Sequence, residues 1–170
     1  SHYPEIDFVF RPHPLLFNNL LEKHIWTREQ IDTYIVRIKE SPNCRYDDSG
    51  DYLQLFADSD AMIHDCGSYI GEYLFTEKPC CYMLKADKQV RKVLLPMGEA
   101  CMAHYYKAFC EADICNFIEN VVLKGNDPLK EKRQQFSRTH LKFNYPHGAQ
   151  TIISLLEETI CTDGENGGTI

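Results

Sequence analysis

"AMIHDCGSYIGEYLFTEKPCCYML", residues 61–84, is the stretch that decides the fold. The apolar run Ala61–His64 predicts a buried strand, Ser68–Thr76 has the apolar spacing of a helix, and Pro79–Leu84 predicts a second buried strand. The small pair Gly67-Ser68 stands where the first strand gives way to the helix. Two interpretations are open here: the serine only caps the helix, or the helix N-terminus binds an anion.

The same alternation of strands and helices runs through the rest of the chain. Strands are expected at Ile6–Phe10, at Cys44–Tyr46 and within "HYYKAF" at 104–109. Residues 91–102 predict a loop with room for a short helix. Helices are expected at 27–40, which Thr27 and Gln30 start as a capping box, and at 52–57, 111–123 and 151–160. A further helix is expected within 125–141, after the Gly-Asn-Asp-Pro turn at 125–128.

Strands alternating with helices are typical of a parallel sheet with helices on its faces. The sequence therefore predicts an α/β fold, a Rossmann-like doubly wound parallel sheet. The strands that begin near Ile6, Ala61 and Pro79 are expected to be parallel members of one sheet. One domain is expected over residues 1–162, followed by a flexible tail at 163–170.

Composition limits the partners. The chain has 170 residues, 44% of them hydrophobic, which is enough for a packed core, and a net charge of -7. That charge argues against nucleic acid or an anionic membrane as a partner, because both need clustered Lys and Arg. No apolar run approaches the roughly 20 residues of a membrane-spanning helix. We expect a cytoplasmic protein; attachment at the inner face of the membrane, through parts outside this sequence, is left open.

Eight cysteines raise the question of zinc or disulfides. No Cys-x-x-Cys pair occurs, and the pairs His64/Cys66 and Cys110/Cys115 lack the spacing of a zinc site. We expect free thiols in a reducing compartment, with no metal and no cofactor.

Two loops at predicted strand ends carry residues suited to phosphate chemistry. In "RPHP", two prolines stiffen the segment, so that Arg11 could grip a phosphate and His13 could act as a general acid or base. The alternative is a rigid surface turn that happens to contain a histidine.

The second loop is "HDCGS", at residues 64–68. Here Gly67 allows close approach of a ligand, Ser68 and the amides behind it could hold a diphosphate, and Asp65 could orient the turn. Glu72, one turn into the helix, could accept hydrogen bonds from a ribose or sugar hydroxyl. The alternatives are a serine cap, an Asx-type turn and a solvated glutamate.

Taken together, "FVFRPHP", "LFADSDAMIHDCGSYIGEYLFTEKPCCYML", "DPLKEKRQQF" and "YPHGAQTI" resemble the C-terminal half of the CDP-glycerol glycerophosphotransferase family, from about Phe8 to Glu158. The resemblance implies a GT-B-type enzyme of two Rossmann-like domains, of which this chain would be the donor-binding half. It implies that His13 is the catalytic or phosphate-handling histidine and that Ser68 and Glu72 match the family's phosphate-binding serine and helical acid. The chain departs from the family's Thr-Asp-Tyr-Ser-Ser at three positions, where it has His64, Cys66 and Gly67.

The reaction that this resemblance implies is transfer of a glycerol-phosphate or glycosyl group from a nucleotide-diphosphate donor, CDP- or UDP-linked, to a cell-envelope acceptor. The acceptor, a polymer or a lipid-linked chain as in teichoic acid synthesis, would be bound by an N-terminal Rossmann-like domain outside this sequence. The other hypothesis is an α/β interaction module that keeps the fold without binding a nucleotide.

Overall fold

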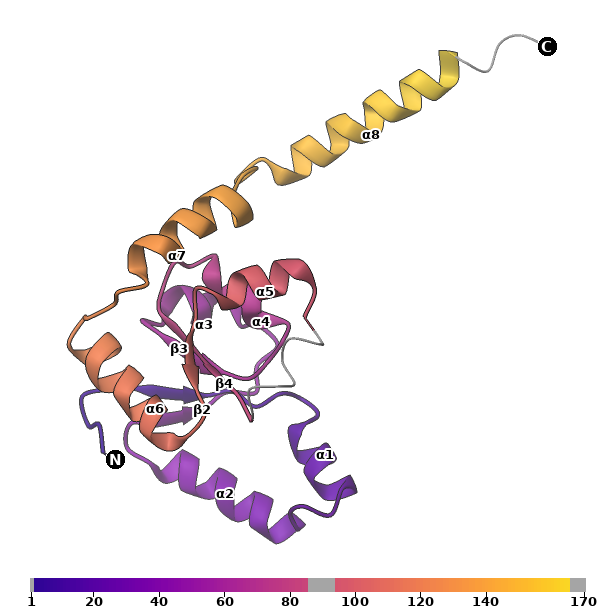
Figure 1. The fold of residues 1–170 in the computed structure, drawn as a ribbon. Coiled ribbons are helices and arrows are strands. Elements are labelled where there is room, and N and C mark those ends of the chain that lie inside the picture. The colour runs from indigo at the N-terminus through magenta and orange to yellow at the C-terminus, as the bar shows by residue number, and fades with distance from the viewer. Residues whose placement is uncertain (1, 86–93, 166–170) are drawn as a thin grey trace. The chain divides into compact units, whose positions relative to one another are not determined.

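The computed structural model describes residues 2–85 and 94–165, with side chains up to residue 160 (Figure 1). The chain divides into two compact units, Ser1–Leu55 and Phe56–Ile170, and each is described by itself. A loop with a short helix was expected at 91–102. Residues 94–102 of this segment are described, and residues 91–93 lie outside the described ranges.

The first unit is a β-α-α-β arrangement with a small parallel sheet. Strands β1 (Phe8–Phe10) and β2 (Cys44–Tyr46) pair in parallel, with Phe8 opposite Cys44. Between them run helices α1 (Leu16–Glu22) and α2 (Arg28–Glu40). The pattern did not predict α1, because its apolar positions follow directly on the proline-rich "RPHP" and carry no cap signal.

Helix α2 confirms the capping box. The Thr27 hydroxyl accepts from the Gln30 amide at 3.2 Å, and the Gln30 side chain accepts from the Thr27 amide at 2.8 Å. On the buried side of the helix, the ring of Tyr34 packs edge-on against Phe10 and Trp26. This aromatic contact ties the helix to β1, since Phe10 is the last residue of that strand.

The second unit holds a three-stranded parallel sheet. Its strands are β3 (Met62–His64), β4 (Cys80–Met83) and β5 (Tyr106–Ala108), in the order β3-β4-β5, with His64 opposite Tyr82. The helical segments of the second unit are α3 (Leu53–Asp58, which begins in the first unit), α4 (Tyr69–Leu74), α5 (Pro96–Met102), α6 (Glu111–Asn116), α7 (Lys130–Phe136), α8 (Gly148–Glu165) and the π-helical η2 (Phe117–Leu123) and η3 (Ser137–Leu141).

The α/β class with parallel strands is confirmed, and the prediction of a single sheet is wrong. Strand β1 pairs with β2, whereas β3, β4 and β5 form a sheet of their own. Hydrophobic runs locate strands but leave their partners open, and β1 finds its partner across the short α1–α2 crossover. In this sheet the strands lie side by side in the order in which they occur along the chain, β3-β4-β5, so the described strands have no reversal of order. The helices α4 and α5 contact each other. A crevice of the kind found at such a reversal is therefore absent among the described strands.

The core of the second unit is built around β4. Cys80, Cys81, Tyr73 and Leu74 are completely buried. The ring of Phe56 packs edge-on against Tyr73 with centroids 5.1 Å apart. Small thiols on the central strand leave room for these aromatic rings, and α4 is held against the sheet as a result.

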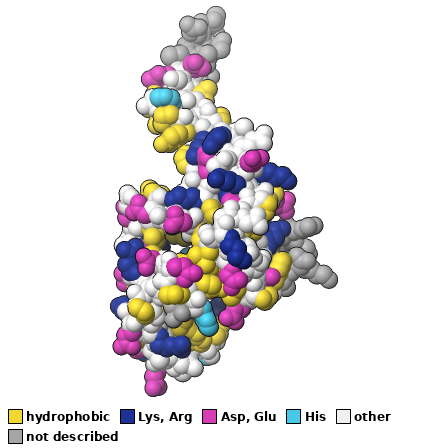
Figure 2. All heavy atoms as spheres, turned by 90° about the vertical axis from the view of Figure 1, so that its left-hand side faces the viewer, with side chains coloured by type: hydrophobic (Ala, Val, Ile, Leu, Met, Phe, Trp, Pro, Cys, Tyr) yellow, Lys and Arg dark blue, Asp and Glu magenta, His cyan; other side chains and the backbone are white. Residues whose placement is uncertain are grey.

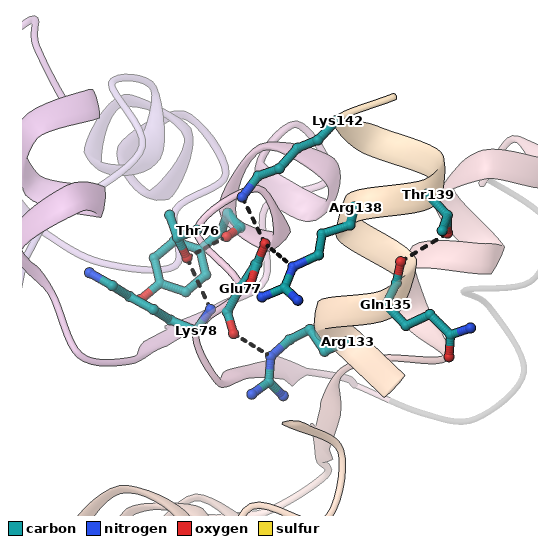
Figure 3. A network of polar contacts seen from close by, with 9 residues as sticks. Thr76, Glu77, Lys78, Arg133, Gln135, Arg138, Thr139 and Lys142 are labelled. Atoms are coloured by element: carbon teal, nitrogen blue, oxygen red, sulfur yellow. Dashed lines mark hydrogen bonds and ion pairs between the residues drawn. The ribbon is translucent and has the colours of Figure 1, made fainter. Parts of the chain in front are cut away.

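A polar network anchors α7 and η3 to the turn before β4 (Figure 3). Arg133, which has no exposed surface, donates from Nε to the carbonyl oxygen of Glu77 at 3.0 Å and pairs with both carboxylate oxygens of Asp127. The carboxylate of Glu77 in turn contacts Arg138 at 2.9 Å and Lys142 at 3.0 Å. Glu77 has φ 66°, so this turn has a left-handed backbone conformation that residues other than glycine rarely adopt.

Helix α8 is longer than predicted. It continues to Glu165, so residues 163–165 of the expected tail are helical, and 166–170 lie outside the described residues. Along the described part of the chain, no helix has both the length and the apolar character needed to cross a membrane. Five large apolar side chains of α8 are each more than half exposed: Ile152, Ile153, Leu155, Leu156 and Ile160.

Candidate functional site

The loop between β3 and α4 is held through its carbonyl groups. The Tyr82 hydroxyl donates to the carbonyl oxygen of Asp65 at 3.0 Å, and His64 Nδ1 lies 3.1 Å from the carbonyl oxygen of Cys66. The next carbonyl, that of Gly67, accepts from the Ile70 amide at 3.4 Å. Three successive carbonyl groups therefore face donors from β3, β4 and α4.

The amides of the same loop are in a different position. Among the described residues, the N–H groups of Gly67 and Ser68 have no hydrogen-bond acceptor. A Cβ placed on Gly67 would meet nothing within 4 Å, so the space beside this residue is open. Backbone amides without a protein acceptor are the groups that bind oxygens in phosphate sites, and an anion at Gly67 and Ser68 stays a prediction.

Ser68 does not act as the cap that the plainer interpretation expects. It occupies the N-cap position of α4 with helical angles, φ -63° and ψ -35°, and its hydroxyl makes no capping hydrogen bond. A capping serine ordinarily has extended angles, which direct its oxygen at the amides of the first turn. The Ser68 hydroxyl is exposed and can therefore contact a ligand.

His64 is a buried histidine beside the loop. It is 6% exposed, and its ring lies edge-on to Tyr82 and Tyr105, with centroids 5.1 and 5.5 Å away. Burial lowers the pKa of His64 to about 4, although the hydrogen bond with Cys66 and the charge of Asp65 oppose this. A carbonyl oxygen can only accept, so the neutral ring carries its proton on Nδ1, and the buried Nε2 has no hydrogen-bond partner among the described residues.

The two remaining residues predicted for this loop and helix are exposed. Asp65 contributes its backbone carbonyl oxygen to the bond with Tyr82, and a role of its carboxylate in orienting the turn stays a prediction. Glu72 lies in the first turn of α4, four residues after Ser68. Its side chain is exposed beside the open loop, and a contact with a sugar hydroxyl stays a prediction.

Arg11 is engaged inside the first unit. Its guanidinium donates to the carboxylate of Asp47 at 2.6 Å and to Ser49, and it lies over the ring of Tyr52. Hydrogen bonds from Ser49, together with Arg11, lower the pKa of Asp47. The arginine thus orders the acidic turn after β2, and a phosphate contact by Arg11 stays a prediction.

His13 is exposed and also takes part in a local turn. Its Nδ1 accepts from the Leu15 amide at 3.1 Å, and its carbonyl oxygen accepts from the Leu16 amide at 2.8 Å. Both bonds lie at the start of α1, as the plainer interpretation expects. With Nδ1 accepting, the neutral ring carries its proton on Nε2, so that His13 presents a donor to solvent.

The predicted residues therefore fall into two groups. Arg11 and His13 belong to the first unit, and Asp65, Gly67, Ser68 and Glu72 belong to the second. The structure brings the second group together around one loop. A site that joins both groups stays a prediction.

The cysteines and the surface charge complete the chemistry. Within the described ranges, seven cysteines are free thiols, and no group of three or more His, Cys, Asp or Glu is arranged to hold a metal ion. On the face shown in Figure 2, Lys and Arg side chains are interspersed with Asp and Glu.

The contacts of His64 and Tyr82 with the loop carbonyl groups were not predicted from the sequence. Both residues lie on strands that were predicted correctly, and the parallel register places them opposite each other. A polar ring at the last position of one buried strand and a tyrosine on the next were the available signal.

Comparisons of the chain with family models, with curated proteins and with solved structures gave no match.

Proposed function

We propose that this chain is the donor-binding domain of a glycerophosphotransferase or glycosyltransferase. It would bind a nucleotide-diphosphate donor, CDP- or UDP-linked, at the β3–α4 loop. We also propose that the chain is one Rossmann-like half of a GT-B-type enzyme, whose other half binds a cell-envelope acceptor. The α/β fold with parallel strands is compatible with this assignment.

The observation that carries the proposal is the pair of unpaired amides at Gly67 and Ser68, with open space beside the glycine. A diphosphate offers oxygens that accept from successive backbone amides, and no side chain obstructs its approach to Gly67. The exposed Ser68 hydroxyl supplies a third donor. This arrangement neutralises phosphate charge without a metal ion, as preorganised donors do in other transfer reactions.

Because His13 Nδ1 is bonded to the Leu15 amide, Nε2 is the ring nitrogen left to face a ligand. In the proposed enzyme His13 assists the acceptor hydroxyl or the leaving phosphate oxygen. Glu72, exposed on the first turn of α4, would bind a ribose or sugar hydroxyl.

Calorimetry with CDP and UDP on three proteins tests the proposal. Loss of one charge-assisted contact costs about 1.5–3 kcal/mol, so Ser68→Ala should weaken nucleotide binding roughly ten- to a hundredfold. Gly67→Val should abolish binding, because its branched side chain would occupy the space of the phosphate. A Cβ at Gly67 meets no protein atom within 4 Å, so we expect the fold to be retained and circular dichroism to be unchanged.

Gly71→Ala is the matched control. Gly71 lies two positions into α4, and a Cβ there also meets nothing within 4 Å. We expect this variant to bind CDP or UDP as the unmodified chain does. Equal affinity in Gly67→Val and in the unmodified chain would mean that the loop is only a helix start.

The exposed apolar side chains of α8 favour a second candidate, an interaction module without nucleotide binding. Ile152, Leu156 and Ile160 recur at intervals of four residues and are all more than half exposed. A module of this kind should show no heat of binding with either nucleotide. The same titration therefore separates the two candidates.

A further inference from the structure

We infer that His64 and Tyr82 are positioning residues that set the conformation of the β3–α4 loop for phosphate binding. The inference rests on the proposed function for the identity of the ligand. The geometry on which it stands belongs to the two side chains and the loop alone.

The carbonyl groups of Asp65 and Cys66 are both held by side chains of the sheet. Tyr82, 8% exposed, donates its hydroxyl to Asp65, and His64, still more deeply buried, donates Nδ1–H to Cys66. Two buried donors thus hold two successive peptide planes from the side of the sheet. Because each peptide plane is rigid, fixing its carbonyl also fixes the N–H of the following residue.

The amide fixed through the Cys66 carbonyl is the N–H of Gly67, one of the two that have no acceptor among the described residues. Glycine has a wide range of backbone angles, and without an anchor its amide would sample many directions. His64 therefore supplies the order that Gly67 itself cannot supply.

His64 and Tyr82 also contact each other. They are register partners on β3 and β4, and their rings pack edge-on, so each side chain fixes the orientation of the other. Tyr105 and Tyr69 close the remaining sides of the imidazole. The charged and titratable groups nearest the ring are thus Asp65 and Cys66 on the loop and the three tyrosines on α4, on β4 and just before β5.

Three substitutions test the inference in the full chain. Tyr82→Phe removes only the hydroxyl, His64→Phe removes the donor but keeps a ring, and His64→Asn places an amide N–H near the position of Nδ1. We expect Tyr82→Phe and His64→Phe each to weaken CDP affinity about five- to tenfold, the effect of losing one typical hydrogen bond. His64→Asn should recover most of the loss, which a merely structural role of the ring would not predict.

A second measurement separates failure of the inference from failure of the proposed function. Amide ¹⁵N relaxation in the absence of ligand should show a lower order parameter at Gly67 in His64→Phe, and at Cys66 in Tyr82→Phe, than in the unmodified chain. Tyr106→Phe is the control, because the Tyr106 hydroxyl donates to Asp127 and not to this loop. The loop should keep its order in that variant.

The outcomes are distinct. Loop order that is unchanged in both Tyr82→Phe and His64→Phe would overturn the inference, whether or not CDP binds. Lower loop order, together with no CDP binding by the unmodified chain, would support the positioning role and reject the nucleotide site. If His64→Phe fails to fold, the pair Tyr82→Phe and Tyr106→Phe decides the question.

Discussion

Burial of a single ring makes the stability of the second unit depend on pH. His64 has a pKa of about 4 in the folded chain and an ordinary value of 6.5, so between these values the unfolded chain binds more protons. The stability that His64 contributes is fully present above pH 6.5 and is lost as the pH falls toward 4. The loss should approach about 3 kcal/mol at the acid end.

Urea unfolding at several pH values between 4 and 7 measures this effect. The free energy of unfolding should fall with decreasing pH more steeply in the unmodified chain than in His64→Phe, because phenylalanine does not titrate. The two curves should differ in slope by at most about 1.4 kcal/mol per pH unit. Parallel curves would contradict the deep burial of the neutral imidazole.

The thiols differ in reactivity because they differ in burial. Burial raises the pKa of Cys81 to about 11 and that of Cys80 well above its ordinary value, whereas Cys110 is exposed. With a thiol-reactive reagent in the native state at pH 7–8, we expect Cys110 to react quickly and Cys80 and Cys81 only after unfolding. Mass spectrometry after timed quenching identifies the modified residues, and rapid labelling of Cys80 would contradict this order.

At the scale of elements, Lys78 links two parts of the second unit. Its ammonium group donates to the carbonyl oxygens of Phe56, Ala57 and Ser59, at the C-terminal end of α3. The last carbonyl groups of a helix have no amide of the next turn to accept from, so a side-chain donor at this end stabilises it. Because a cation also interacts favourably with that end of the helix dipole, Lys78 both caps α3 and ties it to the turn before β4.

We expect Lys78→Met to lower the free energy of unfolding by about 1–3 kcal/mol, since the apolar stem is kept while the hydrogen bonds are lost. Lys124→Met removes the same charge from an exposed position, where the ammonium donates to the Asn120 side chain. That control should change stability by less than about 0.5 kcal/mol. Equal effects of the two substitutions would show that the three carbonyl contacts contribute nothing specific.

The positions of elements could be predicted from the sequence better than their partners could. The strand at Ala61–His64 and the capping box at Thr27 follow from local apolar runs and local hydrogen bonds, so their signals lie within a few residues. The pairing of β1 with β2 depends on a crossover, which periodicity does not encode. In the candidate site, Gly67 and Ser68 could be found from the strand-to-helix junction, but the role of Tyr82 required the register between strands.

At the scale of the whole molecule, α8 should be dispensable for stability. Most of its described side chains are exposed, so its removal takes little apolar surface away from the core. A chain that ends at His147 should unfold within about 1 kcal/mol of the full chain in urea. A much larger loss would show that the apolar side chains of α8 are buried in solution.

Binding of nucleotide phosphate oxygens to the amides of Gly67 and Ser68 can be followed residue by residue in an amide-resolved NMR titration. CDP and UDP are added to the ¹⁵N-labelled chain, with cytidine as the control that lacks phosphate. We expect the largest chemical-shift changes at the amides of Gly67 and Ser68. These changes should saturate with CDP or UDP and be absent with cytidine. Saturating changes elsewhere in the chain, or none at these two amides at millimolar nucleotide, would contradict it.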